Sequence, residues 1–548
     1  MSGFSNPAVI IISLLFILSH ALQKTRILEY LIVRINQLVS RSKSLGLGVY
    51  LLTIAFASAL MNNTAIVAIF MPVTIRLAHR YRMSPSKLLI PLSYAAIMGG
   101  TLTLVGTSTN LIVNSIYINN DGQPLGMFEF AKFGWITLTI GIIYVLTIAP
   151  KILPSRTVTS SLTQSYHMAG YLTEMKLSKD SPLVGSSCQQ RNISQNYDVI
   201  VLDIQRGDRL ITYKVGNEKL QVDDLLFVKG SDESFLQMKE VEKVSILTDE
   251  KLTQNELEQE DNILIECMVT DQSNLIGKTI VSSNFRKRFY AFILAIRREG
   301  SIIRNKIAHV LIQSYDTLLI YGGRKELSKL ANSSGFILLG EVEEQLVKVR
   351  FWWVSIISII FTILFAAVGL LPIIKGALLS VVILLALRII TPNEAYQSIH
   401  WQVIILIAAL IPLGTVIETT GTASFIGDSI AQLVRLFSDS YQPYILLGIT
   451  YLITMILTEV SSNTATAIIM TPIVLSLSAK MGIDARPLIF GVCFAASASF
   501  STPVGYQTNL MVYGPGGYKF SDFIKVGLPL SFTLWLTAII FIPMIWSF

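Results

Sequence analysis

The sequence predicts an α-helical polytopic membrane protein with inverted repeats, two re-entrant hairpins and an inserted α+β cytoplasmic region. Three observations lead to this fold class. Of the 548 residues, 52% are hydrophobic and only 14% are charged, which excludes an ordinary soluble enzyme. The polar step Asn-Thr-Ala occurs twice, at 63–65 and 463–465, each time inside an apolar stretch. Residues 151–350 separate the two apolar parts and hold 26 Lys and Arg against 26 Asp and Glu.

The first apolar part, residues 1–150, is predicted to be one membrane repeat. It opens with an apolar span near Pro7–Leu22, which no Lys or Arg precedes, so a signal peptide is not predicted. Residues 25–40 place their apolar side chains on one helical face, typical of a helix lying on a membrane surface. Residues 46–79 form two apolar arms joined at Asn62-Asn63-Thr64. Each arm has about 15 residues, fewer than a bilayer span needs, which predicts a re-entrant hairpin.

Two further elements complete this repeat. Gly and small polar residues interrupt an apolar helix at GTSTNLIVN, residues 106–114. A full span follows at about 127–149.

The last apolar part, residues 351–548, repeats this order. We expect a span at 401–417, a surface helix from Thr422 to Phe437, a hairpin at 441–479, a helix broken at 502–510 and a span at about 523–546. The matched pairs are Asn63 with Asn463, Pro72 with Pro472, Gly106 with Gly505 and Asn110 with Asn509. This order indicates an internal duplication.

Two spans at about 353–371 and 373–391 have no counterpart in the first part. Either the chain lacks that helical pair or the stated start at Met1 is late. We favour a late start because transporter scaffolds are usually symmetric.

Loop charges predict that the repeats are inverted. Only Glu29 opposes the nine basic residues around the first surface helix and hairpin mouth, which are Lys24, Arg26, Arg34, Arg41, Lys43, Arg76, Arg80, Arg82 and Lys87. In the second copy, three basic residues (Arg435, Lys480, Arg486) face three acidic ones (Asp428, Asp439, Asp484). Because basic loops stay in the cytoplasm, the first hairpin is expected to enter from there and the second from outside. Inverted repeats with interrupted helices indicate a secondary transporter of the cell membrane.

The middle block is duplicated as well. DSPLVGSSCQQ (180–190) resembles QSNLIGKTIVS (272–282), and alternating strands bounded by Gly predict two small α+β domains, 165–245 and 262–343. Both resemble the TrkA C-terminal (RCK-C) domain, which implies either the sensing of a small ligand or a role in assembly alone. Arg206 and Arg297 are expected at matched turn positions, as candidate ligand contacts.

The membrane parts together resemble the divalent anion–sodium symporter family within the ion-transporter superfamily. The motifs that carry the resemblance are NNT (62–64), SNT (462–464), GTSTN (106–110) and TPVGYQTN (502–509). The resemblance implies a homodimer of 11-helix subunits, elevator-type movement and sodium held at each hairpin tip beside the facing helix break. The predicted sodium ligands are Asn62, Asn63, Gly106, Thr107, Asn110, Ser462, Asn463, Gly505, Thr508 and Asn509. The predicted substrate contacts are Asn63, Thr64, Ser108, Asn463, Thr464, Thr502 and Pro503.

These residue types suit the chemistry. Na⁺ prefers several oxygen ligands, which unwound carbonyls and Asn, Ser or Thr side chains provide. An anion prefers N–H donors, which are free where each second hairpin arm begins. Glu459 is a candidate proton-coupling carboxylate, with a structural role as the alternative. No nucleophile–base set, metal cluster or phosphate loop is found, so neither an enzyme nor an organic cofactor is predicted.

Dicarboxylate carriers of this family usually have Pro-Pro where this chain has Ser108-Thr109 and Gln507-Thr508. The extra hydroxyls and amide suit a compact oxyanion, so sodium-coupled sulfate uptake is predicted. The alternatives are a dicarboxylate symporter, an arsenite or chloride efflux carrier, or a regulated cation–proton antiporter. The expected partners are a small inorganic or carboxylate anion and the lipid bilayer, and no nucleic acid.

Overall fold

The computed structural model describes residues 4, 6–24, 43–81, 83–155, 172–206, 209–211, 215–246, 262–289, 291–298, 301–303, 307–324, 327, 330, 335–339 and 352–548. They fall into two compact units. One comprises Met1–Arg156 with Leu346–Phe548, and the other is Thr157–Gln345. The surface helix expected at 25–40 lies outside the described residues.

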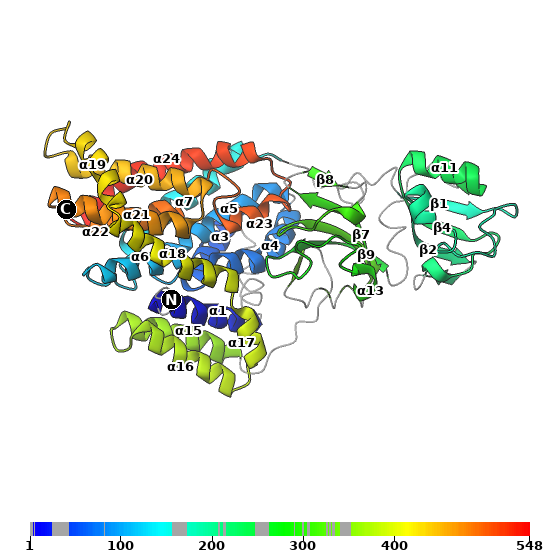
Figure 1. Cartoon of the computed structure of the whole chain (residues 1–548), viewed down its shortest axis with the longest axis horizontal. Coiled ribbons are helices and arrows are strands. Elements are labelled where there is room, and N and C mark those ends of the chain that lie inside the picture. The colour runs from blue at the N-terminus through cyan, green and yellow to red at the C-terminus, as the bar shows by residue number, and fades with distance from the viewer. Residues whose placement is uncertain are drawn as a thin grey trace. The chain divides into compact units, whose positions relative to one another are not determined.

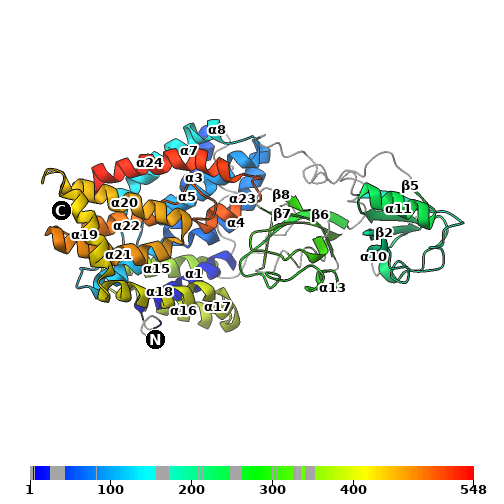
Figure 2. The ribbon, with the colours of Figure 1, turned by 45° about the horizontal axis from the view of Figure 1, so that its top comes forward.

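The first unit is helical (Figures 1 and 2). Its helices in chain order are α1 (Pro7–Lys24), α3 (Lys43–Leu60), α4 (Asn63–Arg80), η1 (Pro85–Lys87), α5 (Leu89–Gly100), α6 (Ser108–Asn119), α7 (Ala131–Thr147), α8 (Ala149–Ile152), α15 (Trp352–Ala367), α16 (Ile373–Ala386), α17 (Pro392–Ser398), α18 (Trp401–Thr419), α19 (Thr422–Val434), α20 (Gln442–Val460), α21 (Asn463–Met481), α22 (Arg486–Ser497), α23 (Gln507–Tyr513) and α24 (Phe520–Ile545).

Several of these helices suit a membrane. Among the described residues, five are long and apolar enough to cross one, or up to six if the bent pair Pro392–Ser398 and Val403–Gly414 counts as one span. Helix α24 shows why: it exposes a stripe of large apolar side chains at intervals of four residues, namely Phe520, Ile524, Leu528, Phe532, Leu536, Ile540 and Met544. Such an exposed apolar stripe is unfavourable in water and becomes stable when lipid covers it. The helical content and these spans fit a polytopic membrane protein.

The two helix pairs that meet at Asn-Thr are longer than the sequence pattern indicates. Helices α3 and α4 have 18 residues each, and α20 and α21 have 19 each. The helices include polar end residues such as Lys43 and Lys480, which an apolar run leaves out. Pro72 and Pro472 lie inside α4 and α21 without ending them. The apolar parts of the first pair, Leu45–Leu60 and Asn63–Ala78, are nevertheless shorter than a full span, as expected, whereas α20 and α21 are each long and apolar enough to cross a membrane.

The open ends of these two pairs contact opposite ends of α24. After α4, the Ser86 carbonyl accepts a hydrogen bond of 2.6 Å from the Tyr518 hydroxyl, just before α24 begins. After α21, the Arg486 guanidinium donates to the Glu129 carboxylate at 2.7 Å. The Trp546 indole, just past the end of α24, donates to the same carboxylate at 2.8 Å. Helices α20, α21 and α24 run side by side in both views (Figures 1 and 2).

The second unit contains two five-stranded sheets of the same topology. The first sheet has the order β3-β2-β4-β1-β5, and the second has the order β10-β6-β9-β7-β8, so each strand of the first matches the strand five numbers later. The strands of the first sheet are β1 (Leu172–Leu177), β2 (Ile200–Arg206), β3 (Arg209–Ile211), β4 (Leu225–Lys229) and β5 (Val244–Ile246). Those of the second are β6 (Asn262–Val269), β7 (Ala291–Arg298), β8 (Ser301–Ile303), β9 (Thr317–Gly323) and β10 (Phe336–Leu338).

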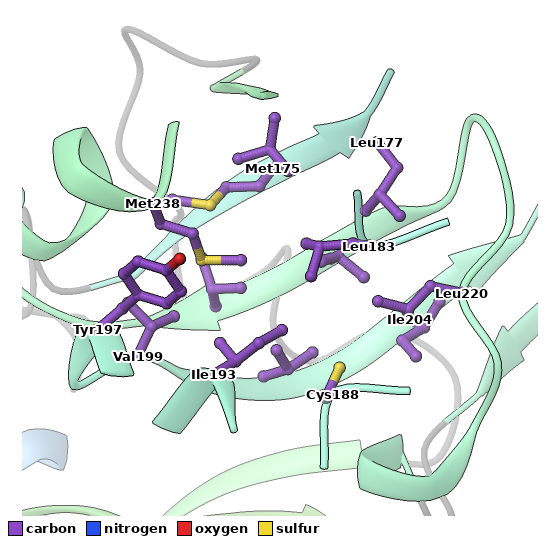
Figure 3. Packing of buried hydrophobic residues seen from close by; sticks show 14 of the residues in the cluster. Met175, Leu177, Leu183, Cys188, Ile193, Tyr197, Val199, Ile204, Leu220 and Met238 are labelled. Atoms are coloured by element: carbon purple, nitrogen blue, oxygen red, sulfur yellow. The ribbon is translucent and has the colours of Figure 1, made fainter. Parts of the chain in front are cut away.

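Short helices cover these sheets. They are α10 (Ile193–Tyr197), η2 (Val215–Asn217), α11 (Asp232–Glu242), α13 (Phe285–Phe289) and η3 (Ile307–His309). Figure 3 shows the core of the first module, where Met175 of β1 and Met238 of α11 belong to one buried cluster. Such burial supplies most of the stability of a small α+β module.

The matched arginines of the two modules differ by one residue from the expected pair. Arg206 donates to Asp224 at 2.9 Å, and Arg298, not Arg297, makes the same contact with Asp316 at 2.6 Å. Arg297 instead pairs with Glu266 at 3.3 Å. Because Asp224 and Asp316 are buried, Arg206 and Arg298 neutralise charges of the fold itself. The expected match of Arg206 with Arg297 is therefore wrong.

Buried charges lie where the two modules touch. Leu202 and Phe227 of the first module share an apolar cluster with Leu294 and Leu319 of the second. Beside this cluster, the Tyr321 hydroxyl donates to the Asp203 carboxylate at 2.5 Å, and the Lys229 ammonium donates to the carbonyl of Leu294. Burial raises the pKa of Asp203 to about 6, although the bond from Tyr321 works against this shift.

This pKa predicts that the contact between the modules weakens as pH rises from about 4 to about 6. In that window the folded protein holds a proton on Asp203 that the unfolded chain has lost, so stability falls with rising pH and is constant above it. In Asp203→Asn the fall should disappear, and strands β2 and β9 should exchange amide hydrogen more slowly than in the wild type at pH 7. Hydrogen exchange of the two proteins, compared at the same pH, measures this.

Asp180→Asn, which alters an exposed carboxylate of the same module, is the matched control and should leave exchange unchanged. Equal exchange rates for the wild type and Asp203→Asn at pH 7 would contradict the assignment.

Candidate functional site

The turn between α3 and α4 is held by its own polar side chains. Asn63, the first residue of α4, is buried, and its Oδ1 accepts a hydrogen bond of 2.6 Å from the buried Ser58 hydroxyl. Asn62 Oδ1 accepts from the Thr64 amide at 2.9 Å, which satisfies one of the free N–H groups at the start of the helix. The apolar surroundings make these bonds necessary, since an unpaired buried polar group costs about 1–3 kcal/mol.

The turn between α20 and α21 repeats this arrangement. Thr458, five residues before Asn463 as Ser58 is before Asn63, lies 2.7 Å from the side-chain amide of Asn463 through its hydroxyl. Ser462 caps the new helix by accepting from the Ala465 amide at 3.2 Å. Both Asn-Thr turns therefore use a hydroxyl of the incoming helix to hold the asparagine of the outgoing one.

A helix break lies beside each turn, slightly earlier in the sequence than expected. Residues 101–107 separate α5 from α6, and residues 498–506 separate α22 from α23. In the first break, the Thr103 hydroxyl donates to the Ala59 carbonyl at 2.6 Å and accepts from the Gly106 amide at 3.0 Å. Asn110, in the first turn of α6, donates to the Thr103 carbonyl at 3.0 Å.

The second break makes the same three contacts. The Thr502 hydroxyl donates to the Glu459 carbonyl at 3.0 Å and accepts from the Gly505 amide at 3.1 Å. Asn509 donates to the Thr502 carbonyl at 3.1 Å. In both halves, a threonine hydroxyl thus joins the break to the end of the neighbouring helix, and an asparagine holds the unwound backbone.

Glycine is required where the break passes the turn. A Cβ on Gly106 would lie 2.3 Å from the Gly100 carbonyl oxygen, and one on Gly505 would lie 2.0 Å from Ser499 Oγ. A Cβ on Gly100 would lie 2.4 Å from Asn63 Oδ1. These glycines therefore permit an approach that any other residue would prevent.

The first turn contacts the second break directly. Asn63 Nδ2 donates to the Tyr506 hydroxyl at 2.6 Å, and the Thr64 hydroxyl donates to Gln507 Oε1 at 3.1 Å. The Tyr506 hydroxyl also makes side-chain contacts with Thr107 of the first break and with Asn463 of the second turn. The structure thus brings together both turns and both breaks around one phenol oxygen.

The side-chain amides of Asn463 and Asn110 also lie at this junction. The Asn463 amide donates through its NH₂ group to the Gly505 carbonyl at 2.9 Å and to the Thr458 hydroxyl at 2.7 Å, and the Thr458 hydroxyl donates to the Ala496 carbonyl at 2.7 Å. In the first half, the buried Asn110 Oδ1 has no hydrogen-bond partner among the described residues. An amide oxygen without a donor is one of the ligands that an alkali cation prefers.

Some predicted ligands point elsewhere. Asn509 Oδ1 lies 2.7 Å from the Ser93 hydroxyl of α5, and Thr508 Oγ1 lies 2.8 Å from the same hydroxyl. Asn509 Nδ2 bonds the Ser499 and Thr502 carbonyls, so this side chain is fully engaged within the protein. Pro503 is buried in the second break. Ser108 and Thr464 lie partly exposed in the first turns of α6 and α21.

Four helices begin at the junction: α4 at Asn63, α21 at Asn463, α6 at Ser108 and α23 at Gln507. Their first N–H groups and the positive ends of their dipoles suit an anion. A carboxylate also lies nearby. Glu459 is half-buried, and its two oxygens accept from the Ser501 amide at 2.7 Å and from Ser499 Oγ at 3.3 Å. The matched residue of the first half is Ala59, so the charge belongs to one half alone.

Sequence reasoning missed three residues of this junction, Ser58, Thr458 and Tyr506, and it singled out Gln507 only for its amide group. Ser58 and Thr458 each carry a hydroxyl five residues before an Asn, a matched spacing that would have found them. Tyr506 and Gln507 lie inside a motif that was recognised, but the sequence gives no sign that their side chains cross to the other half.

Comparison with known proteins agrees with this architecture. The profile of the family described as citrate transporters matches residues 1–490 and again residues 460–548. An uncharacterized transporter of Synechocystis is 35% identical over 100% of this chain and 90% of its own length. Sodium/sulfate cotransporter 1 of Chlamydomonas reinhardtii is 22% identical over 98% of this chain and 83% of its own length. A sodium-dependent high-affinity dicarboxylate transporter of Caenorhabditis elegans is 31% identical over 26% of this chain and 25% of its own length. The chain is therefore a multi-pass membrane transporter of the citrate transporter family, within the ion-transporter superfamily.

Proposed function

We propose that the protein is a secondary active transporter that couples the uptake of a small divalent oxyanion, sulfate in the first place, to sodium. The observation that carries this proposal is the junction itself, where two oxygen-rich turns and four helix N-termini meet around Tyr506. Oxygen ligands serve a cation and free N–H groups serve an anion, so one site suits both. The name of the sodium/sulfate cotransporter relative supports this choice of ions.

The two cation sites are proposed to lie one in each half. In the second half, the Gly505 and Ala496 carbonyls would hold the ion, together with Asn463 Oδ1 after the amide has rotated away from its hydrogen bond to the Gly505 carbonyl. In the first half, Asn63 and the unpartnered Asn110 Oδ1 would contribute. Asn509 and Thr508 are now proposed to hold the break and not the ion, because Ser93 occupies their oxygens.

We also propose that the two helix pairs are inverted re-entrant hairpins that move as an elevator. Their contacts with opposite ends of α24, through Ser86 and Glu129, support entry from opposite sides. The basic residues around the first mouth support a cytoplasmic position for that side and for residues 151–350.

The remaining expectations stay proposals of the same kind. The two modules of the second unit are proposed to be RCK-C-like domains that bind a small ligand or support assembly, and the transporter is proposed to be a homodimer. A dicarboxylate is the second candidate substrate, because one relative with that name aligns with part of the chain. Arsenite or chloride efflux and cation–proton antiport remain alternatives.

The test is uptake of radiolabelled sulfate into proteoliposomes that contain the purified protein. An inward sodium gradient should drive accumulation, whereas an equal potassium gradient should not. Unlabelled succinate should compete weakly compared with unlabelled sulfate. Uptake that ignores the sodium gradient would refute the proposed coupling, and uptake of succinate in preference to sulfate would make the dicarboxylate the substrate.

Asn463→Ala should raise the sodium concentration for half-maximal uptake by about tenfold or more. The physical reason is the loss of one ligand oxygen, and a bond to a charged group contributes about 1.5–3 kcal/mol. The measurement is the sodium dependence of sulfate uptake after normal membrane insertion. Asn196→Ala, an exposed asparagine of the second unit, is the control. An unchanged sodium dependence in Asn463→Ala would remove this residue from the site.

Glu459→Gln tests whether the carboxylate adds charge to the second cation site. We expect a several-fold higher half-saturating sodium concentration, a smaller effect than that of Asn463→Ala because the carboxylate already accepts two hydrogen bonds. Glu233→Gln, an exposed residue of the second unit, should have no effect. If the wild type instead accumulates sulfate under an acid gradient without sodium, and Glu459→Gln loses this uptake, then the coupling ion is a proton.

A further inference from the structure

The two breaks end in the same backbone conformation but carry different side chains. Thr107 precedes α6 with φ −138° and ψ 142°, and Tyr506 precedes α23 with φ −136° and ψ 135°. The Thr107 hydroxyl turns back and accepts from the Thr109 amide of its own helix. Tyr506 makes no such cap. Its longer side chain crosses instead to the other half.

This crossing places the phenol oxygen at the centre of the junction. Asn63 Nδ2 donates to it at 2.6 Å, so one acceptor position of the hydroxyl is used. Asn463 and Thr107 approach the same oxygen from two other elements. The hydroxyl therefore lies between the two turns, at the place where the proposed anion would meet the helix N-termini.

The residue after Tyr506 also has a larger side chain than its counterpart in the first half. Gln507 stands where the first half has Ser108, and its Oε1 accepts from the Thr64 hydroxyl at 3.1 Å. A phenol ring replaces a threonine side chain, and an amide side chain of five heavy atoms replaces a hydroxymethyl group. The second half thus fills space between the turns that two copies of the first half would leave open.

We infer that Tyr506 determines the size and shape of the transported anion. Its ring closes the space that the second carboxylate of a dicarboxylate would need, and its hydroxyl donates a hydrogen bond to an oxygen of a compact tetrahedral oxyanion. This inference rests on the proposed function and names the residue by which that site selects its substrate class.

Two substitutions separate the roles of the ring and the hydroxyl. Tyr506→Phe keeps the ring, so dicarboxylate should stay excluded while the KM for sulfate rises about tenfold through the lost donor. Tyr506→Thr copies the residue of the first half, so sulfate uptake should fall while sodium-driven uptake of radiolabelled succinate appears. Both are measured in proteoliposomes beside the wild type. Tyr444→Phe, an exposed tyrosine near the start of α20, is the control and should match the wild type.

The possible results test the proposed function, the role of the hydroxyl and the role of the ring separately. A wild type without sodium-dependent sulfate uptake would overturn the proposed function and this inference with it. If the wild type transports sulfate, a KM for sulfate unchanged in Tyr506→Phe would overturn the role of the hydroxyl. A Tyr506→Thr protein that elutes as a single species and still excludes succinate would overturn the role of the ring. If Tyr506→Thr does not fold, competition by unlabelled succinate in Tyr506→Phe decides: strong competition would overturn size exclusion by the ring, and weak competition would support it.

Discussion

The structure depends on one constraint: helices that stop inside an apolar body must pair the backbone groups they release. A helix end leaves up to four N–H and four C=O groups without intrahelical partners, and lipid offers none. Here the two breaks and the two Asn-Thr turns provide hydrogen-bond partners for one another. Thr103 and Thr502 each join a break to the last carbonyls of a neighbouring helix. The polar residues of the breaks and turns therefore stabilise the fold, in addition to any role that they have in transport.

The two halves share a set of hydrogen bonds and differ in many of the side chains around it. The contacts of Ser58, Thr103 and Asn110 recur at Thr458, Thr502 and Asn509, so the framework is symmetric. Four of the differing pairs lie at the junction, namely Ala59 with Glu459, Gly100 with Ser499, Thr107 with Tyr506 and Ser108 with Gln507. Every one of these changes places a larger or more polar side chain in the second half. The two halves thus share these hydrogen bonds but present different side chains at the junction.

Much of this fold could be predicted from the sequence, because the governing signals are local. Apolar runs, Gly-rich breaks and a repeated Asn-Thr step can be recognised in the sequence. They predicted most of the described helices of the membrane part, the two Asn-Thr turns and the presence of strands in the inserted region. The start of the first of these helices was missed because α3 begins at Lys43, before the apolar run. The arginine match was off by one residue because the Arg297-Arg298 step contains two candidates, and only the buried Asp316 shows which one is equivalent to Arg206.

The junction was less predictable for a different reason. The motif around Tyr506 could be recognised, yet the direction in which its side chain points is set by the approach of α4, which lies more than 400 residues earlier in the chain. The same holds for Thr508 and Asn509, whose oxygens are taken by Ser93 of the other half. Contacts between elements so distant in sequence follow from the packing of the whole unit, and a single sequence carries no record of them.

Sharing one hydroxyl between the turns gives the proposed transport cycle a physical basis for coupling. A cation among the oxygens of Asn463 would fix the orientation of its amide, and Asn463 contacts Tyr506, which in turn accepts from Asn63. An anion that receives the proton of Tyr506 would therefore meet a site already ordered by the cation. Linkage makes this advantage reciprocal, since the anion must raise the affinity for the cation by the same factor. Coupling then needs no direct contact between the two ions, only a hydrogen-bond network that both of them order.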